Sequence, residues 1–167
     1  MKITYREAEN TDAKALLEFL SLAGGETDNL SFGKDSFKIS EEKEAKFIEK
    51  FKNNRKNLML VATCEDKVIA NASIERNRIE RYSHRAELSI AVLKEYWGKG
   101  IGSALMEKLV SFAKDTECKV LYLEVREDNT RAVSLYRKFG FETIGVYKSF
   151  FNINGIYYNA LLMALYL

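Results

Sequence analysis

The sequence of 167 residues has no proline, two cysteines, one histidine and one tryptophan. Two cysteines are too few for a disulfide framework. Cys64 and Cys118 also lack a metal-ligand spacing, so we expect two reduced, buried thiols and no metal site. No apolar run is long enough to cross a bilayer, and the N-terminus "MKITYREAEN" lacks the apolar segment of a signal peptide. We therefore expect a cytoplasmic protein without a membrane partner.

An excess of charge of one sign is also absent. The 26 Lys and Arg residues are scattered among 24 Asp and Glu residues, which leaves a net charge of +2. Binding of nucleic acid needs a concentrated positive surface, so we expect no nucleic-acid partner. The hydrophobic fraction of 47% is ordinary for a globular protein, and no repeat, linker or low-complexity segment interrupts the chain. Residues 1–167 are therefore expected to form one domain.

The spacing of apolar residues predicts the order of helices and strands. The predicted elements are a strand at 2–8, helices at 11–23 and 40–54, strands at 57–65, 67–77 and 85–93, a helix at 100–116, a strand at 119–125, a helix at 129–140 and a hairpin over 141–167. The helix at 100–116 connects two strands and so makes them parallel neighbours. This order predicts an α/β fold in which a mixed sheet carries helices on both faces.

Local signals mark where several of these elements begin and end. Thr11 or Asp12 is the expected N-cap of the first helix, and Ser40 is the expected N-cap of the second. Residues 24–40 show no period and are predicted to form a loop, which at this length is more often functional than inert. Asn154–Gly155 is a strong turn signal within the final hairpin.

Three glycines stand at alternate positions in "WGKGIGS", residues 97–103, between a predicted strand and a predicted helix. Free N–H groups and the helix dipole make such a turn an anion site, and missing side chains let a phosphate touch the backbone. A P-loop would need Lys and then Ser or Thr after its last glycine. A dinucleotide fingerprint would need glycine where Ser103 stands. The pyrophosphate of coenzyme A is the third ligand type, and glycines that only permit tight packing of helix on sheet are the structural alternative.

Two motifs then point to a family. "IAVLKEYWGKGIGSALMEKLVSFA" followed by "LYLEVREDNTRAVSLYRKFGF" resembles the GNAT superfamily of N-acetyltransferases, in motif style its bacterial ribosomal-protein and amino-acid N-acetyltransferases. The family's phosphate-turn pattern Gln/Arg-x-x-Gly-x-Gly/Ala matches 97–102 except at Trp97. The downstream motif matches at Asn129, Ala132, Leu135, Tyr136, Gly140 and Phe141. The resemblance implies the GNAT fold, a mostly antiparallel sheet of about seven strands in which the parallel pair splays apart.

The resemblance also implies acetyl-CoA as cosubstrate and assigns residues to it. The main chain of Ile90, Ala91 and Val92 would bind the pantetheine arm. The phosphates would lie on Gly98, Lys99, Gly100, Ile101, Gly102 and Ser103, with Asn129 and Tyr136 contacting the cofactor from the later helix. Trp97 replaces the usual Gln or Arg, and Lys99 could supply compensating charge. We interpret Trp97 as packing beside the turn rather than stacking on adenine.

Acetyl transfer to an amine needs an oxyanion donor, a base and an acid. Tyr136 matches the family's proton donor to the leaving thiolate, and the alternative is a half-buried tyrosine that packs the helix. Glu124 resembles the base of the ribosomal-protein enzymes, and Glu87 matches the base of other branches; of the two we favour Glu124. For each, a structural ion pair or an outward-facing carboxylate is the alternative. His84 is expected to be a surface residue.

The acceptor site of the superfamily is built by the loop at 24–40 and by the final hairpin near 148–158. Aromatic residues of this hairpin suit a small amine or a peptide N-terminus, and they are Tyr147, Phe150, Phe151, Tyr157 and Tyr158. We therefore predict an N-acetyltransferase that acts on an amino acid, a peptide N-terminus or a small amine by direct attack in a ternary complex. A homodimer is the candidate assembly. The alternative is a non-catalytic acyl-CoA-binding or sensing domain, and the sequence does not identify the amine.

Overall fold

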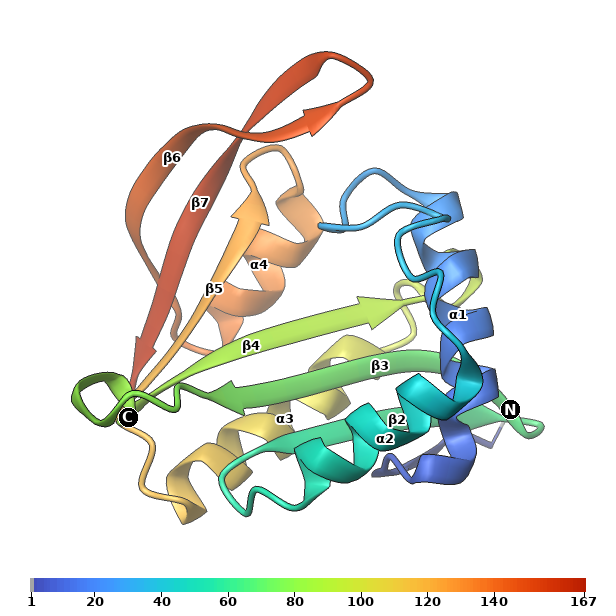
Figure 1. Ribbon diagram of the computed structural model, residues 1–167. Coiled ribbons are helices and arrows are strands. Elements are labelled where there is room, and N and C mark those ends of the chain that lie inside the picture. The colour runs from blue at the N-terminus through green and yellow to red at the C-terminus, as the bar shows by residue number, and fades with distance from the viewer. Residues whose placement is uncertain (1) are drawn as a thin grey trace.

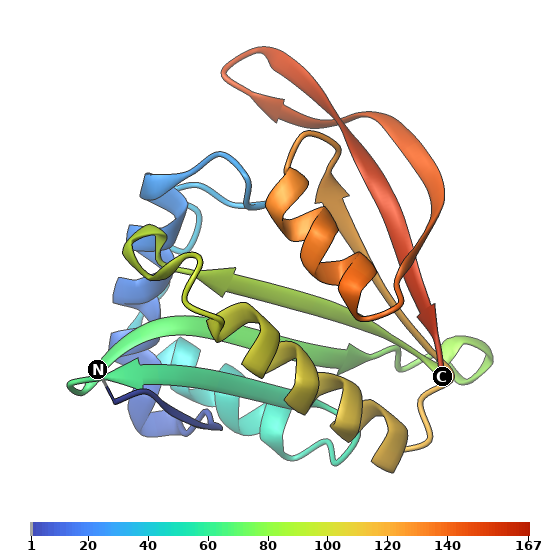
Figure 2. The ribbon, with the colours of Figure 1, turned by 180° about the vertical axis from the view of Figure 1, so that it is seen from behind.

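The computed structural model describes residues 2–167 and shows one seven-stranded sheet with helices on both faces (Figures 1 and 2). The strands are β1 (Thr4–Glu7), β2 (Leu58–Cys64), β3 (Lys67–Arg76), β4 (Arg85–Val92), β5 (Val120–Arg126), β6 (Glu142–Ile153) and β7 (Ile156–Tyr166). The α-helices are α1 (Ala13–Glu26), α2 (Glu41–Lys52), α3 (Ile101–Asp115) and α4 (Thr130–Lys138). The spatial order is β1-β2-β3-β4-β5-β7-β6. Within residues 2–167, β4 and β5 pair in parallel and the other neighbours are antiparallel, which confirms the predicted fold class.

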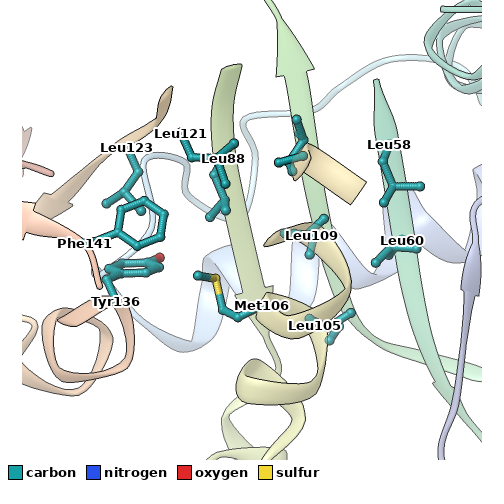
Figure 3. Packing of buried hydrophobic residues seen from close by; sticks show 14 of the residues in the cluster. Leu58, Leu60, Leu88, Leu105, Met106, Leu109, Leu121, Leu123, Tyr136 and Phe141 are labelled. Atoms are coloured by element: carbon teal, nitrogen blue, oxygen red, sulfur yellow. The ribbon is translucent and has the colours of Figure 1, made fainter. Parts of the chain in front are cut away.

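Each face of the sheet is packed by a different pair of helices. Helices α3 and α4 cover one face, where Leu105, Met106 and Leu109 pack against strand residues such as Leu88 and Leu121 (Figure 3). Helices α1 and α2 cover part of the other face over β2 and β3, with Phe19 and Ile48 among the buried side chains. Burial of apolar side chains at helical spacing is what holds each helix on the sheet. Both cysteines are buried and unpaired, as predicted.

Asp12 is the N-cap residue of α1, one of the two residues predicted for this position. Ser40 caps α2 as expected, its hydroxyl accepting the Lys43 N–H at 3.3 Å. Asp12, however, does not cap α1 with its side chain. Its carboxylate forms two hydrogen bonds with the Arg6 guanidinium, at 2.6 and 2.7 Å, and accepts the Glu9 N–H at 2.8 Å. The Arg6 hydrogen bonds hold the pKa of Asp12 below its ordinary value. The charged carboxylate thereby links β1 to the start of α1.

Helix α1 also runs three residues beyond its predicted end, through Gly24 and Gly25 to Glu26. A Cβ at Gly24 would lie 2.5 Å from the carbonyl carbon of Gly33, so the α1–α2 loop (residues 27–40) folds back onto the helix at this point. The predicted start of the loop at residue 24 is therefore wrong, and Gly24 marks a close approach between two backbone segments.

The two tight hairpin turns agree with the sequence. Asn154 (φ 52°) and Gly155 (φ 82°) join β6 to β7, and Glu65 (φ 49°) and Asp66 (φ 62°) join β2 to β3. Two consecutive residues with positive φ give the backbone twist that suits adjacent antiparallel strands. The predicted turn at Asn154–Gly155 is confirmed.

Candidate active site

The parallel strands β4 and β5 are paired along only part of their length. Their register covers Arg85–Val120, Ala86–Leu121 and Glu87–Tyr122, after which the strands diverge (Figures 1 and 2). Strand β4 nevertheless continues to Val92. Main-chain N–H and C=O groups on the facing edges beyond these pairs therefore have no strand partner.

The predicted pantetheine-binding residues Ile90, Ala91 and Val92 lie in this diverging part of β4. The side chains of Ile90 and Val92 pack against the α3–α4 core, and that of Ala91 packs on the α1–α2 side. The main-chain groups of Ile90 and Val92 face the open edge, whereas those of Ala91 face its partner Asn71 on β3, so the prediction for Ala91 does not fit this edge. The Val92 carbonyl already accepts a hydrogen bond from the Trp97 indole at 2.8 Å.

The turn between β4 and α3 has the backbone of an anion site. Gly98 (φ 76°) and Gly100 (φ 80°) adopt left-handed conformations, and a Cβ at either position would meet no atom within 4 Å. Helix α3 begins at Ile101 without a side-chain cap. Its first-turn N–H groups therefore face open space at the positive end of the helix dipole. The geometry fits a phosphate resting on bare backbone.

The remaining turn residues have different roles. A Cβ at Gly102 would lie 3.1 Å from the Leu135 side chain, so this glycine permits contact between α3 and α4 rather than access for a ligand. The Ile101 side chain is buried in the core, which leaves only its main chain for the predicted phosphate contact. Ser103 follows in the first turn of α3 and is half-buried. Of the three glycines, therefore, only Gly102 has the alternative role of permitting tight packing.

Trp97 packs beside the turn, as predicted. Its indole N–H binds the Val92 carbonyl, and the Arg131 guanidinium carbon lies 4.6 Å from the centre of its ring. The ring therefore links the turn to the start of α4. The exposed Lys99 ammonium lies 4.9 Å from the centre of the Tyr96 ring, next to the turn.

Helix α4 brings Asn129 and Tyr136 toward the diverging strands. Asn129 caps the helix, its Oδ1 accepting the Ala132 N–H at 3.3 Å. Tyr136 lies two turns later on the same side of the helix. Figure 3 shows its ring beside Phe141, with the hydroxyl directed toward Leu88 of β4 and Met106 of α3. The structure thus directs Tyr136 toward β4, with Asn129 at the N-cap of the same helix.

Tyr136 is 6% exposed. Burial in this apolar environment raises its pKa to about 12, because the phenolate would lose its hydration. The phenol is therefore protonated throughout the neutral range and can act as an acid toward a base formed nearby.

Three carboxylates lie on the sheet face opposite to α3 and α4. Glu75 and Glu87 are directly paired across β3 and β4, Glu87 is paired with Tyr122, and Glu124 is two residues further along β5 on the same face. All three glutamates are exposed, and none forms an ion pair within residues 2–167. The structure therefore contradicts the ion-pair alternative for Glu87 and Glu124, and both are outward-facing carboxylates.

The pKa of Glu87 is raised above its ordinary value. Partial desolvation between the neighbouring strands is the main cause, and the like charges of Glu124 and Glu75 add to it. Desolvation also raises the pKa of the adjacent Tyr122, and Glu87 adds to this effect. A carboxylate with a raised pKa is a better proton acceptor near neutral pH. His84, in contrast, is an exposed residue at the start of β4, as expected.

Two segments flank this carboxylate face at the end of the molecule where β4 and β5 are furthest apart. One is the α1–α2 loop, and the other is the hairpin tip (residues 147–158), which Figures 1 and 2 show at the same end. The β6–β7 register shifts between Tyr147 and Phe151, where Phe150 packs edge-on against both rings. Tyr147 and Tyr157 are exposed. The structure thus places the predicted loop and the predicted aromatic hairpin beside the same sheet face.

Sequence reasoning missed one residue of this region. Arg126 is the last residue of β5 and shares its face with Glu124, but no role was assigned to it. The residue is 7% exposed, and its side chain contacts both flanking segments. The sequence did offer a signal for this residue. An arginine ends a strand in which every second residue is apolar, and a buried arginine needs partners.

Comparisons with known proteins agree with this geometry. Residues 27–141 match the acetyltransferase (GNAT) family. The L-amino acid N-acetyltransferase AaaT of Escherichia coli strain K12 is 34% identical over 107 residues, which are 63% of this chain and 65% of that protein. The N-alpha-acetyltransferase RimI of Mycobacterium tuberculosis is 40% identical over 67 residues, 40% of each chain. The chain thus matches less than two thirds of the length of these two relatives.

Solved structures match over nearly the whole chain. An acetyltransferase of the GNAT family from Streptococcus pneumoniae has a TM-score of 0.96 at 30% identity, covering 99% of this chain and 100% of that one. The Salmonella typhimurium protein yncA, a putative acetyltransferase solved with its cofactor acetyl-CoA, has a TM-score of 0.86 at 20% identity, covering 99% and 94%. Such low identity supports the fold alone.

No helix in residues 2–167 has the length and apolar character needed to cross a membrane. The same residues contain no group of three or more His, Cys, Asp and Glu side chains placed to hold a metal ion.

Proposed function

The chain belongs to the acetyltransferase (GNAT) family, and on this premise we propose that it transfers the acetyl group of acetyl-CoA to a primary amine. The acceptor is an amino acid, a peptide N-terminus or a small amine. One observation carries the proposal: β4 and β5 separate between a buried tyrosine on one sheet face and a pair of carboxylates on the other. An acid and a base thus flank the open edge of a strand.

The residues that would hold acetyl-CoA follow from the free backbone groups. The N–H groups at the start of α3, beside Gly98 and Gly100, bind the pyrophosphate. The open edge of β4 at Ile90 and Val92 binds the pantetheine arm, and an N–H of this edge polarises the thioester carbonyl. Asn129 keeps an amide group for the cofactor while it caps α4. When bound, acetyl-CoA supplies an activated acetyl thioester.

Tyr136 is the proposed acid. Its protonated phenol lies on the α4 side of the diverging strands and donates a proton to the departing thiolate. The apolar surroundings that raise the pKa of Tyr136 also raise that of a thiol, which favours protonation of the leaving group.

For the base we propose Glu87, assisted by Glu124. Both carboxylates lie on the same face, but Glu87 is at the last paired position before β4 and β5 separate, and its pKa is raised. The negative charge of Glu124 helps to keep it raised. The sequence favoured Glu124 over Glu87 as the base, and this assignment reverses that preference. The proton passes from the acceptor ammonium to Glu87 directly or through water.

Substituting each carboxylate separates these roles. Glu87→Gln is expected to lower kcat/KM by about 100-fold, since a positioned base contributes at least that much. Glu124→Gln is expected to preserve the plateau of the pH profile but move its acid limb to lower pH, because removing a like charge lowers the pKa of Glu87. Steady-state kinetics between pH 5 and about 9 measures both effects.

Glu75→Gln is the control for this pair, since Glu75 adds the smaller like-charge effect and should shift the limb least. Loss of the plateau in Glu124→Gln but not in Glu87→Gln would instead make Glu124 the base. Full activity of both variants would exclude a carboxylate base on this face.

The proposed function itself is tested with a panel of amines. The protein is mixed with acetyl-CoA and with amino acids, short peptides or small amines, and release of the coenzyme A thiol is followed. Turnover is expected with one amine class, at a rate that rises with pH as the acceptor amine loses its proton. Binding of acetyl-CoA without turnover on any amine would favour the non-catalytic alternative. Failure to bind acetyl-CoA would contradict both.

A further inference from the structure

Arg126 joins the two segments that flank the carboxylate face. One guanidinium nitrogen, Nη1, donates to the main-chain carbonyl of Asp28 in the α1–α2 loop at 3.0 Å. The face of the guanidinium lies on the Tyr158 ring of the hairpin tip, with 3.8 Å between its carbon and the ring centre. These partners are far apart in the sequence and come together through this one side chain.

The orientation of Arg126 is fixed by a third partner. Its Nε and Nη2 donate to the two carboxylate oxygens of Asp128, at 2.9 and 2.6 Å. These hydrogen bonds hold the pKa of Asp128 below its ordinary value, so the pair stays charged at neutral pH. A planar guanidinium can place one edge on a carboxylate, one nitrogen on a carbonyl and one face on a ring, which an ammonium cannot do.

The position of Arg126 relates this cluster to the proposed chemistry. It lies on β5, on the same face as Glu124 and two residues from it. The next residue, Glu127, accepts a hydrogen bond from the Asn159 side chain at 3.0 Å, and Asn159 accepts the Ser149 N–H at 3.1 Å. The end of β5 therefore holds the hairpin tip at two points and the α1–α2 loop at one.

We propose that Arg126 is a positioning residue that holds the α1–α2 loop and the hairpin tip together as the two walls of the acceptor site. This proposal rests on the proposed function for the identity of that site. It assigns to Arg126 no contact with the reacting atoms. Its effect is to fix the distance between the walls, and so to determine how tightly an acceptor amine is bound.

The test compares two buried arginines. Arg126→Lys keeps the charge but loses the bidentate pair and the stacking. Arg76→Lys is the matched control, because Arg76 is 5% exposed and donates to the carbonyls of Ser83 and Thr116, both at 2.6 Å, away from these walls. Hydrogen exchange of residues 27–36 and 147–158 is expected to be about tenfold faster in Arg126→Lys and unchanged there in Arg76→Lys.

Kinetics provides the second readout. In Arg126→Lys the KM of the acceptor amine is expected to rise about tenfold, the size expected for loss of a charged hydrogen bond, while the Kd of acetyl-CoA stays within about twofold. Unchanged exchange in both segments would overturn the proposal, as would faster exchange with an unchanged acceptor KM. Absence of turnover in every variant would contradict the proposed function, whereas the exchange measurement still decides whether Arg126 joins the walls.

A second pair of variants covers the case in which Arg126→Lys does not fold. Tyr158→Phe keeps the ring under the guanidinium, and Tyr158→Leu removes it. Exchange in residues 147–158 is expected to be unchanged in the first and faster in the second. Equal exchange in the two variants would contradict the stacking contact as a holding element.

Discussion

Replacing Tyr136 with Phe is expected to lower kcat by about 100-fold or more, while the Kd of acetyl-CoA stays within about threefold. The substitution removes only the hydroxyl group. The ring keeps its place beside Phe141 in the core, so the fold and the cofactor site persist. What is lost is the proton for the departing thiolate. Stopped-flow or steady-state thiol release gives kcat, and calorimetric titration gives the affinity.

The state of the Tyr136 hydroxyl is checked without substrate. Its pKa is raised from 10.0 to about 12 in the folded protein, so the folded state favours the protonated phenol. Stability is therefore undiminished below pH 10 and falls by about 1.4 kcal/mol per pH unit as the pH rises toward 12. Tyr136→Phe lacks this loss. Denaturant unfolding of both proteins above pH 10 measures the difference. For the kinetic prediction, an unaltered kcat in Tyr136→Phe would contradict the role of Tyr136 as acid.

Gly100→Asp is expected to weaken acetyl-CoA binding by about 100-fold or more. Position 100 has a left-handed backbone and open space where a Cβ would point, at the start of α3. Asp adopts this backbone more readily than most residues, so it strains the turn less than most other side chains would. Its carboxylate would occupy the positive helix end that the pyrophosphate needs and would repel it. A 100-fold change corresponds to about 2.7 kcal/mol, the size of one or two charged hydrogen bonds.

Two matched variants identify the cause. Gly100→Asn has nearly the same shape without the charge, so it should weaken binding much less than Gly100→Asp. Gly155→Asp introduces the same charge at a glycine with φ 82° and open space, but at the turn of the β6–β7 hairpin. Its affinity for acetyl-CoA should equal that of the unaltered protein. If Gly100→Asp and the unaltered protein bind acetyl-CoA equally well, the turn is not part of the cofactor site.

Much of the fold could be predicted because its signals are local. The order of helices and strands follows from apolar spacing, and the Asn154–Gly155 turn follows from the backbone preferences of two residues. The parallel pairing of β4 and β5 follows from the connection between them. Errors occurred where another residue competes for a local signal. Asp12 stands at the N-cap position of α1 but its carboxylate binds Arg6, and α1 continues through Gly24, where the backbone of Gly33 lies close.

The sequence by itself determined the element order, the resemblance to a family of acetyltransferases and the identity of the candidate acid, bases and phosphate turn. Tertiary structure decided how those residues differ from one another. Gly102 packs against Leu135, whereas Gly98 and Gly100 face open space. The raised pKa of Glu87 depends on charges of two neighbouring strands, and the three partners of Arg126 come from three separate segments. Each of these properties is set by strand register and by contacts between segments distant in sequence, which no local pattern of residues encodes.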